Sequence, residues 1–150
     1  GMGTTLVAAT IFDHHMCVGN VGDSRLYVYH EGQLQQVTQD HSVVGEMVRK
    51  GEMPKEQARN HPKRNLITRA VGAEKEIRVD FFDETLADGD LVLMCTDGLT
   101  SMVEEKQIEE VLASAVSLQE KTNRLVELAN DNGGKDNITV IIIEPFSDEV

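Results

Sequence analysis

The sequence contains little cysteine, comparatively little positive charge and no long apolar run. Its only cysteines among 150 residues are Cys17 and Cys95, which are too few for a disulfide framework. Each lies in an apolar stretch, so we expect two reduced, buried thiols of a cytoplasmic protein. No run approaches the ~18 consecutive apolar residues of a membrane span. The first residues also lack the basic and apolar regions of a signal peptide, which argues against membrane insertion.

Negative charge is in excess, with 26 Asp and Glu against 14 Lys and Arg and a formal net charge of -12. Surfaces that bind nucleic acid or anionic membranes need clustered Lys and Arg, so this balance argues against both. An excess of carboxylates suits divalent cations better. With 40% hydrophobic and 27% charged residues, the chain is too hydrophobic to be disordered and is long enough for one domain with its own core.

The hydrophobic pattern predicts several strands, then two helices, then a final strand. Residues 4–38 are expected to form an antiparallel meander, with further strands at 77–85, 90–95 and 137–143. The run LVLMC is continuous and apolar, as in a strand buried on both faces. Amphipathic helices at 104–113 and 117–130 should lie on a sheet. Regular βαβ alternation is missing, so the sequence predicts an α+β fold with antiparallel sheets.

The segment at about 40–66 interrupts the strands. Apolar residues with helical spacing, a glycine that ends the helix and two prolines predict a helical excursion; these residues are Val43, Val44, Met47, Val48, Gly51, Pro54 and Pro62. We call residues 40–66 the flap-like excursion. The basic residues Lys63, Arg64 and Arg69 are interpreted as a solvated face, with substrate contact as the alternative.

Three aspartates lie at predicted strand ends: Asp23, Asp97 and Asp136. Each has a simple structural explanation. Asp23 could form a hairpin turn with Arg25 as its ion-pair partner, Asp97 could cap a helical turn over 99–102, and Asp136 could form an Asx turn. Taken together they indicate part of a metal site, because Mg²⁺ and Mn²⁺ prefer carboxylate oxygens and strand ends can converge at one edge of a sandwich. The five histidines lack helical i,i+4 spacing and indicate no zinc site.

Five segments, in order along the chain, point to a known family: GMGTTLVAA, VGNVGDSRLYVY, LITRAVG, DLVLMCTDGLTSMV and GGKDNITVII. With them the chain resembles the C-terminal part of metal-dependent Ser/Thr protein phosphatases of the PPM class (type 2C), especially the short bacterial ones. The resemblance covers essentially the whole chain. It implies a sandwich of two antiparallel sheets flanked by helices, with metals at one end.

The resemblance also implies roles for particular residues. Asp97 and Asp136 correspond to ligands of two catalytic Mn²⁺ or Mg²⁺ ions, and Asp23 corresponds to a ligand, with Asp97, of a third ion. The flap-like excursion corresponds to a flap concerned with substrates, and Ser24 and Arg25 have a structural role. The implied reaction is hydrolysis of phosphoserine and phosphothreonine in proteins by a metal-activated water, without a covalent intermediate. The implied partners are phosphorylated proteins, a Ser/Thr kinase and its substrates.

One part of the family pattern has no counterpart here. Family members begin with strands and helices that supply a phosphate-binding arginine, a histidine that acts as a general acid, and an Asp-Gly-Met-Gly-Gly segment whose aspartate bridges two metals. We therefore interpret residues 1–150 as a partial catalytic domain, inactive when isolated and prone to self-association through uncovered strand edges. The alternative is a non-catalytic interaction or regulatory module that retains the fold.

Overall fold

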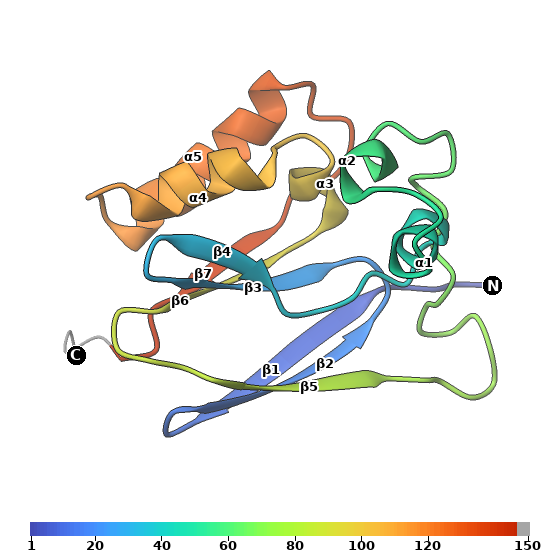
Figure 1. Cartoon of the computed structure of the whole chain (residues 1–150), viewed down its shortest axis with the longest axis horizontal. Helices are drawn as coiled ribbons and strands as arrows, with labels where there is room; N and C mark the ends of the chain where they lie inside the picture. Colours follow the sequence, from blue (N-terminus) through green and yellow to red (C-terminus); the bar gives the residue numbers. More distant parts are fainter. Residues whose placement is uncertain (147–150) are drawn as a thin grey trace.

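The structure, a computed structural model, describes residues 1–146 and contains two antiparallel sheets, one of which is covered by helices (Figure 1). The three-stranded sheet has the order β1-β2-β5, from β1 (Leu6–Phe12), β2 (His15–Val21) and β5 (Asp80–Thr85). The four-stranded sheet has the order β4-β3-β6-β7, from β3 (Arg25–His30), β4 (Gln33–Gln36), β6 (Leu91–Cys95) and β7 (Val140–Ile143). Helices α4 (Glu105–Ala113) and α5 (Leu118–Asp131) cover the four-stranded sheet. The predicted α+β fold with antiparallel sheets is confirmed.

The chain changes sheets between β2 and β3, so the predicted single meander over the first four strands is wrong. β2 pairs with β1 and β5, whereas β3 pairs with β4 and β6. Each of these two strands has an apolar face, and the two faces meet across the core because Met16 and Val18 share a cluster with Leu26. The change of sheet occurs at Gly22, which has a φ of +111° and lies so close to Thr5 that an added Cβ would come within 2.4 Å of its methyl group.

The protein has two hydrophobic layers, one on each side of the four-stranded sheet. Between the sheets lie Met16, Val18, Leu26, Val28, Val37, Leu86 and Val92. Between the four-stranded sheet and the helices lie Tyr27, Leu91, Leu93, Cys95, Leu99, Val103, Ile108, Leu112, Leu125 and Ala129. β6 contributes to both layers, since Val92 faces one and its neighbours Leu91 and Leu93 face the other. The prediction that LVLMC is a strand buried on both faces is confirmed.

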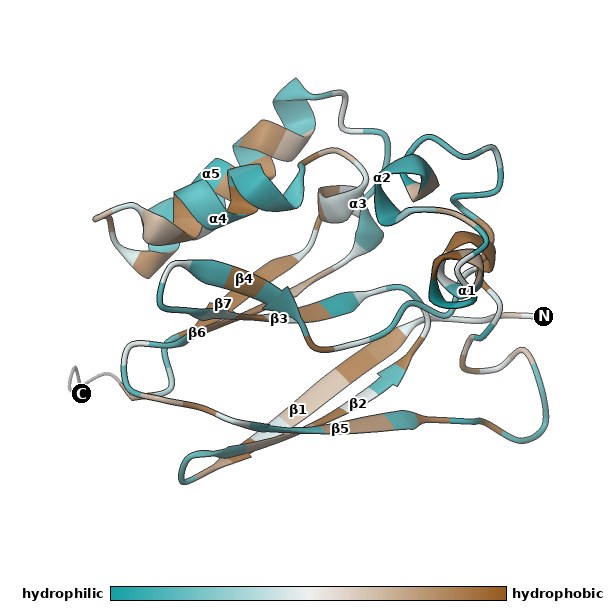
Figure 2. Cartoon of the chain, in the orientation of Figure 1, coloured by the Kyte–Doolittle hydropathy of each residue, from teal (hydrophilic) through white to brown (hydrophobic). Residues whose placement is uncertain are grey.

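The outer face of the three-stranded sheet is not covered by a helix in residues 1–146 (Figure 1). Phe12, Phe81 and Leu6 are 84%, 71% and 55% exposed, and hydrophobic segments run along β1 (Figure 2). Cys17 lies on the same face, opposite Thr10 of β1 and Asp83 of β5, and is exposed. The prediction of two buried thiols is therefore wrong for Cys17 and confirmed for Cys95. An apolar run shows that a strand forms but does not show whether both of its faces are covered.

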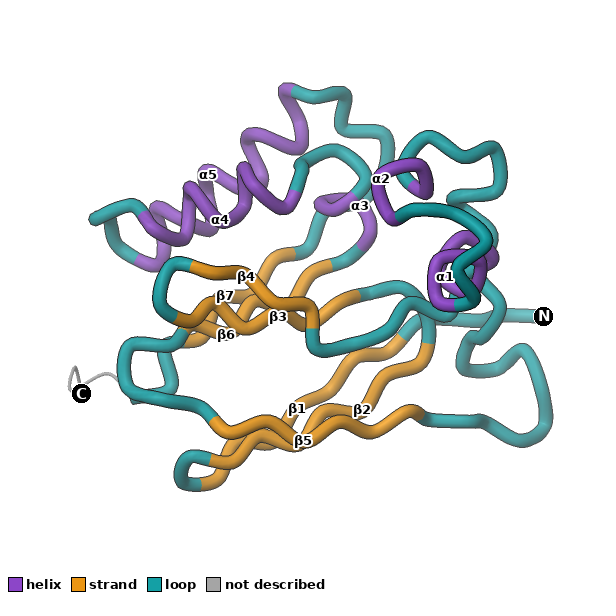
Figure 3. The backbone as a smooth tube through the Cα atoms, in the orientation of Figure 1, coloured by secondary structure: helices purple, strands orange, loops and turns teal. Residues whose placement is uncertain are grey.

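The flap-like excursion contains two short helices joined by loops (Figure 3), α1 (Val43–Arg49) and α2 (Lys55–Ala58). The Ser42 side chain caps α1 by accepting a hydrogen bond from the Gly45 N–H (3.0 Å). The apolar spacing predicts α1 but not α2, because four residues are too few for a periodic pattern. Lys63 and Arg64 are exposed, as expected for a solvated face.

The third member of the predicted basic cluster differs from the other two. Arg69 is partly buried and donates a hydrogen bond of 2.8 Å to Asp80 Oδ1, so its assignment to a solvated face is wrong. The structure also shortens two predicted strands, which begin at Asp80 and Val140 and not at residues 77 and 137. Among residues 1–146, no helix combines the length and apolar character that a membrane span requires.

Candidate metal centre

Strand register brings the three predicted aspartates to one end of the four-stranded sheet. The last residue of β6, Cys95, lies opposite Arg25 at the start of β3 and opposite Val140 at the start of β7. Asp97 follows β6 by two residues, and Asp23 precedes β3 by two residues. Asp136 lies in the segment that leads into β7. Because the strands are antiparallel, the end of one and the starts of its two neighbours coincide.

Asp97 is the first residue of helix α3 (Asp97–Thr100), whose N-cap is Thr96. The N-cap position therefore belongs to Thr96, although the Asp97 carboxylate accepts hydrogen bonds from the backbone N–H groups of residues 97 and 98. The next residue, Gly98, packs directly on the backbone near Asp136, since a Cβ on Gly98 would lie 2.0 Å from the carbonyl oxygen of Asn137. Only glycine allows this close approach. It fastens the helix that carries Asp97 to the segment that carries Asp136.

Asp136 lies at a bend, and its side chain does not make the bond to the residue two positions on that defines an Asx turn. Its Oδ1 accepts a hydrogen bond from the backbone N–H of Asn137 at 2.7 Å, and the residue is exposed. A carboxylate keeps further lone pairs when it accepts one such bond. The contact with the Asn137 N–H and a ligand role are thus compatible for Asp136.

Burial and neighbouring negative charges raise the pKa of two of the three carboxylates, those of Asp23 and Asp97. Burial, followed by the negative charges of Asp97 and Asp40, raises the pKa of Asp23 to about 6. Burial, followed by the charge of Asp136, raises the pKa of Asp97 above its ordinary value. Negative groups that crowd together in this way would be neutralised by a divalent cation, so the residues fit a metal site. Within residues 1–146, however, no three His, Cys, Asp or Glu side chains are grouped closely enough to hold an ion by themselves.

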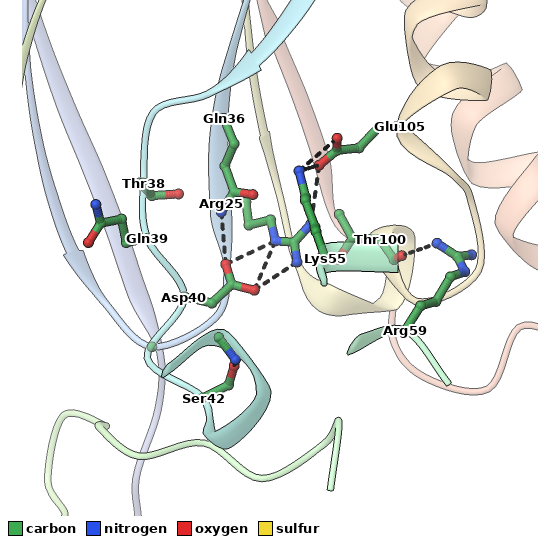
Figure 4. A network of polar contacts seen from close by, with 12 residues as sticks. Arg25, Gln36, Thr38, Gln39, Asp40, Ser42, Lys55, Arg59, Thr100 and Glu105 are labelled. Carbon is green, nitrogen blue, oxygen red and sulfur yellow. Dashed lines mark hydrogen bonds and ion pairs between the residues drawn. The ribbon is translucent and has the colours of Figure 1, made fainter. Parts of the chain in front are cut away.

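Arg25 does not pair with Asp23, so the reading of residues 22–25 as a hairpin turn with this ion pair is wrong. Its guanidinium binds Asp40 through Nε (2.9 Å) and Nη2 (2.7 Å) (Figure 4). Its Nη1 donates to the Tyr27 hydroxyl at 2.8 Å. The neighbouring Ser24 is buried, with its hydroxyl 2.8 Å from that of Thr5. The contacts between Arg25 and Asp40 tie the base of the flap-like excursion to β3.

A cleft of about 420 Å³ opens beside Asp23, between the flap-like excursion and the segment from α3 to α4. Its charged lining includes Lys55 and Arg59 from the excursion and Glu105 from α4. Lys55 Nζ lies 2.9 Å from Glu105 Oε1 across the cleft (Figure 4). Sequence reasoning missed these three residues, because they come from elements far apart in the chain and no spacing relates them.

Comparison with known proteins matches this chain to one family. The profile described as protein phosphatase 2C matches residues 1–133. The chain belongs to the protein phosphatase 2C family. Among its relatives, the serine/threonine phosphatase stp of Listeria monocytogenes is 47% identical over 144 residues, which cover 96% of this chain and 57% of that protein.

Solved structures of the protein phosphatase 2C family have the same fold. Serine/threonine phosphatase Stp1 from Staphylococcus aureus matches with a TM-score of 0.92 and 38% identity, covering 98% of this chain and 58% of the other. The catalytic domain of the phosphatase PstP, solved in complex with two manganese ions, matches with a TM-score of 0.84 and 35% identity, covering 95% and 58%. The chain thus spans less than two thirds of the length of these relatives.

Proposed function

We propose that this chain is the C-terminal part of a protein phosphatase 2C catalytic domain, and that the whole domain hydrolyses phosphoserine and phosphothreonine in proteins. In this proposal Asp97 and Asp136 are ligands of two catalytic ions, and Asp23 is a ligand of a third. The observation that carries the proposal is the register around Cys95, which sets these carboxylates at one end of the sandwich where they repel one another. The phosphatase names of the relatives support the reaction.

The ions are Mn²⁺ or Mg²⁺, and the two manganese ions of the PstP domain support the former. When bound, such ions supply an acidified water and neutralise charge on a phosphate ester. The protein's own part is to hold carboxylate oxygens in place. Gly98 keeps Asp97 against the backbone of residue 137, and Arg25 with Asp40 fixes the strand that follows Asp23.

We also propose that the ligand set is completed by the bridging aspartate of the Asp-Gly-Met-Gly-Gly segment, which the family has and this sequence lacks. Residues 1–146 bring no complete cluster together by themselves. The purified chain should then show no appreciable manganese-dependent hydrolysis of p-nitrophenyl phosphate. Adding the N-terminal portion of a related phosphatase should restore turnover, and Asp97→Ala should abolish the restored activity. Substantial turnover by the purified chain alone would contradict this part of the proposal.

The ligand assignment has a direct test that does not require turnover. Calorimetric titration with Mn²⁺ should show weak binding that Asp97→Ala removes. The matched control is Asp88→Ala, in the exposed turn between β5 and β6, which should leave binding unchanged. Tight binding that persists in Asp97→Ala would refute the assignment.

The remaining parts of the proposal concern the cellular setting. We propose phosphorylated proteins as substrates, a Ser/Thr kinase as partner and the cytoplasm as location, with the free thiols of Cys17 and Cys95 as support. Cell fractionation tests the location, and capture with a phosphopeptide library tests the substrate class. No observation on residues 1–146 favours the alternative of a non-catalytic module.

A further inference from the structure

Arg59, at the end of α2, donates hydrogen bonds to backbone carbonyls on the far side of the cleft. Its Nη1 lies 3.0 Å from the Thr100 oxygen and 3.4 Å from the Val103 oxygen, and its Nη2 lies 3.1 Å from the Ser101 oxygen. Figure 4 shows the side chain reaching from the flap-like excursion to Thr100. One partly buried guanidinium therefore joins two segments that are more than 40 positions apart.

The acceptors explain why an arginine is used at this position. The last carbonyls of a helix have no partner within the helix, and Thr100 ends α3. A charged donor makes a stronger hydrogen bond than a neutral one, and the planar guanidinium can serve several acceptors in a fixed geometry. A lysine is a single point charge and cannot reproduce this arrangement. The contact is thus specific to arginine.

Helix α3 lies between this contact and the candidate metal centre. Arg59 holds its C-terminal end, and Asp97 is its first residue. The helix is a single turn, closed by a hydrogen bond from the Ser101 N–H to the Asp97 oxygen (2.8 Å). A displacement of the Thr100 end of α3 should therefore also displace the Asp97 end.

A second contact crosses the same cleft but is weaker. The ion pair of Lys55 with Glu105 joins side chains that are 58% and 38% exposed. Exposed ion pairs contribute little, because water screens them and both side chains lose freedom. Arg59 is therefore the main connection between α2 and the segment that carries Asp97.

We propose that Arg59 is a positioning residue that latches α2 to α3, so that closure of the flap-like excursion and the placement of Asp97 depend on each other. The link to metal binding rests on the proposed function, whereas the latch itself does not. Because coupling between two sites is reciprocal, an ion bound at Asp97 should hold α2 closed, and closed α2 should strengthen ion binding.

Hydrogen exchange of the metal-free chain tests the latch. Arg59→Gln should speed exchange roughly tenfold, the change expected for one or two lost hydrogen bonds, in both segments 54–60 and 98–104. Exchange in β2 and β6 should not change. Arg59→Lys should give an intermediate result, and the matched control Lys55→Gln a much smaller one. Faster exchange confined to 54–60, or equal effects of Arg59→Gln and Lys55→Gln, would overturn the proposal.

Adding Mn²⁺ tests the coupling. In the unmodified chain the ion should slow exchange in both segments, whereas in Arg59→Gln it should slow only 98–104. Equal slowing of 54–60 in both proteins would overturn the role of Arg59. If Mn²⁺ does not slow hydrogen exchange in the unmodified chain, the proposed metal site is refuted. The metal-free comparison of Arg59→Gln with Lys55→Gln still tests whether Arg59 connects α2 to α3. Should Arg59→Gln not fold, Arg59→Lys provides the same comparison with a smaller expected difference.

Discussion

Replacing Gly98 by alanine tests whether the close approach of two backbones builds the candidate metal centre. The added Cβ would lie 2.0 Å from the Asn137 oxygen and 2.8 Å from its carbonyl carbon. An ordinary carbon to oxygen contact is about 3.3 Å, so the two backbones would have to separate by about 1.3 Å. A flexible side chain could rotate away, but a carbonyl in the backbone cannot.

The expected loss of stability follows from two opposing terms. Overpacking of a close contact costs about 1–3 kcal/mol, and backbone atoms place this case at the upper end. Alanine in a helix is more favourable than glycine by about 1 kcal/mol, which offsets part of the loss. We therefore expect Gly98→Ala to lower the free energy of unfolding by about 2 kcal/mol. The separation also moves Asp97 away from Asp136, so Mn²⁺ affinity should fall.

Urea unfolding followed by far-ultraviolet circular dichroism provides the assay, because the chain has no tryptophan for fluorescence. The matched control is Gly19→Ala on the outer face of β2, where the nearest atom to an added Cβ is a Phe81 ring carbon at 3.4 Å. The free energy of unfolding of that variant should lie within about 0.5 kcal/mol of the value for the unmodified protein. If Gly98→Ala matches the control in both stability and Mn²⁺ affinity, the argument from close packing is refuted.

Three further predictions concern charge and exposed surface. Asp23→Asn should stabilise the metal-free chain by about 1–2 kcal/mol above pH 6, since ionising a carboxyl with a raised pKa opposes folding. This stabilisation should decrease as the pH falls from about 6 to 3.8 and should be absent below pH 3.8. If urea unfolding shows the same stabilisation at pH 7.5 and at pH 3.5, the prediction is contradicted. Arg25→Gln should lower the free energy of unfolding by about 2 kcal/mol, because it leaves the partly buried Asp40 carboxylate without its ion-pair partner. Arg124→Gln removes only an exposed ion pair and should change the free energy of unfolding by less than about 0.5 kcal/mol, also measured by urea unfolding. Because Phe12 and Phe81 are exposed, the unmodified chain should self-associate at high concentration, and the double variant Phe12→Ser, Phe81→Ser should be a monomer. Light scattering that shows the unmodified chain to be a monomer would count against this prediction.

Local patterns were sufficient for most secondary structure. Alternating and continuous apolar runs predict the strands, and amphipathic spacing predicts α4 and α5, because both depend on neighbours within one element. The same reasoning failed where pairing decides the outcome. It joined β2 to β3 in one meander, although hydrogen bonding between strands depends on partners far away in the chain.

The candidate centre shows the same division. The aspartates were found because each follows or precedes a strand, a feature that is visible in the sequence. Arg59 was not found, because its partners are backbone carbonyls, and a carbonyl that lacks a partner leaves no mark on residue identity. Cys17 was misplaced for a related reason, since apolar neighbours do not reveal whether a face of a sheet is covered.

By itself, the sequence determined the class of fold, the family and three candidate ligands, because these depend on residue type and on order along the chain. Only the tertiary structure decided that the end of β6 and the starts of β3 and β7 coincide at Cys95, and so that the charge of Asp97 acts on Asp23 and the charge of Asp136 acts on Asp97. It also decided that Gly98 and Arg59 hold the helix bearing Asp97 from its two ends. The physical reason is that charge repulsion and close packing depend on distance in space, which strand register sets.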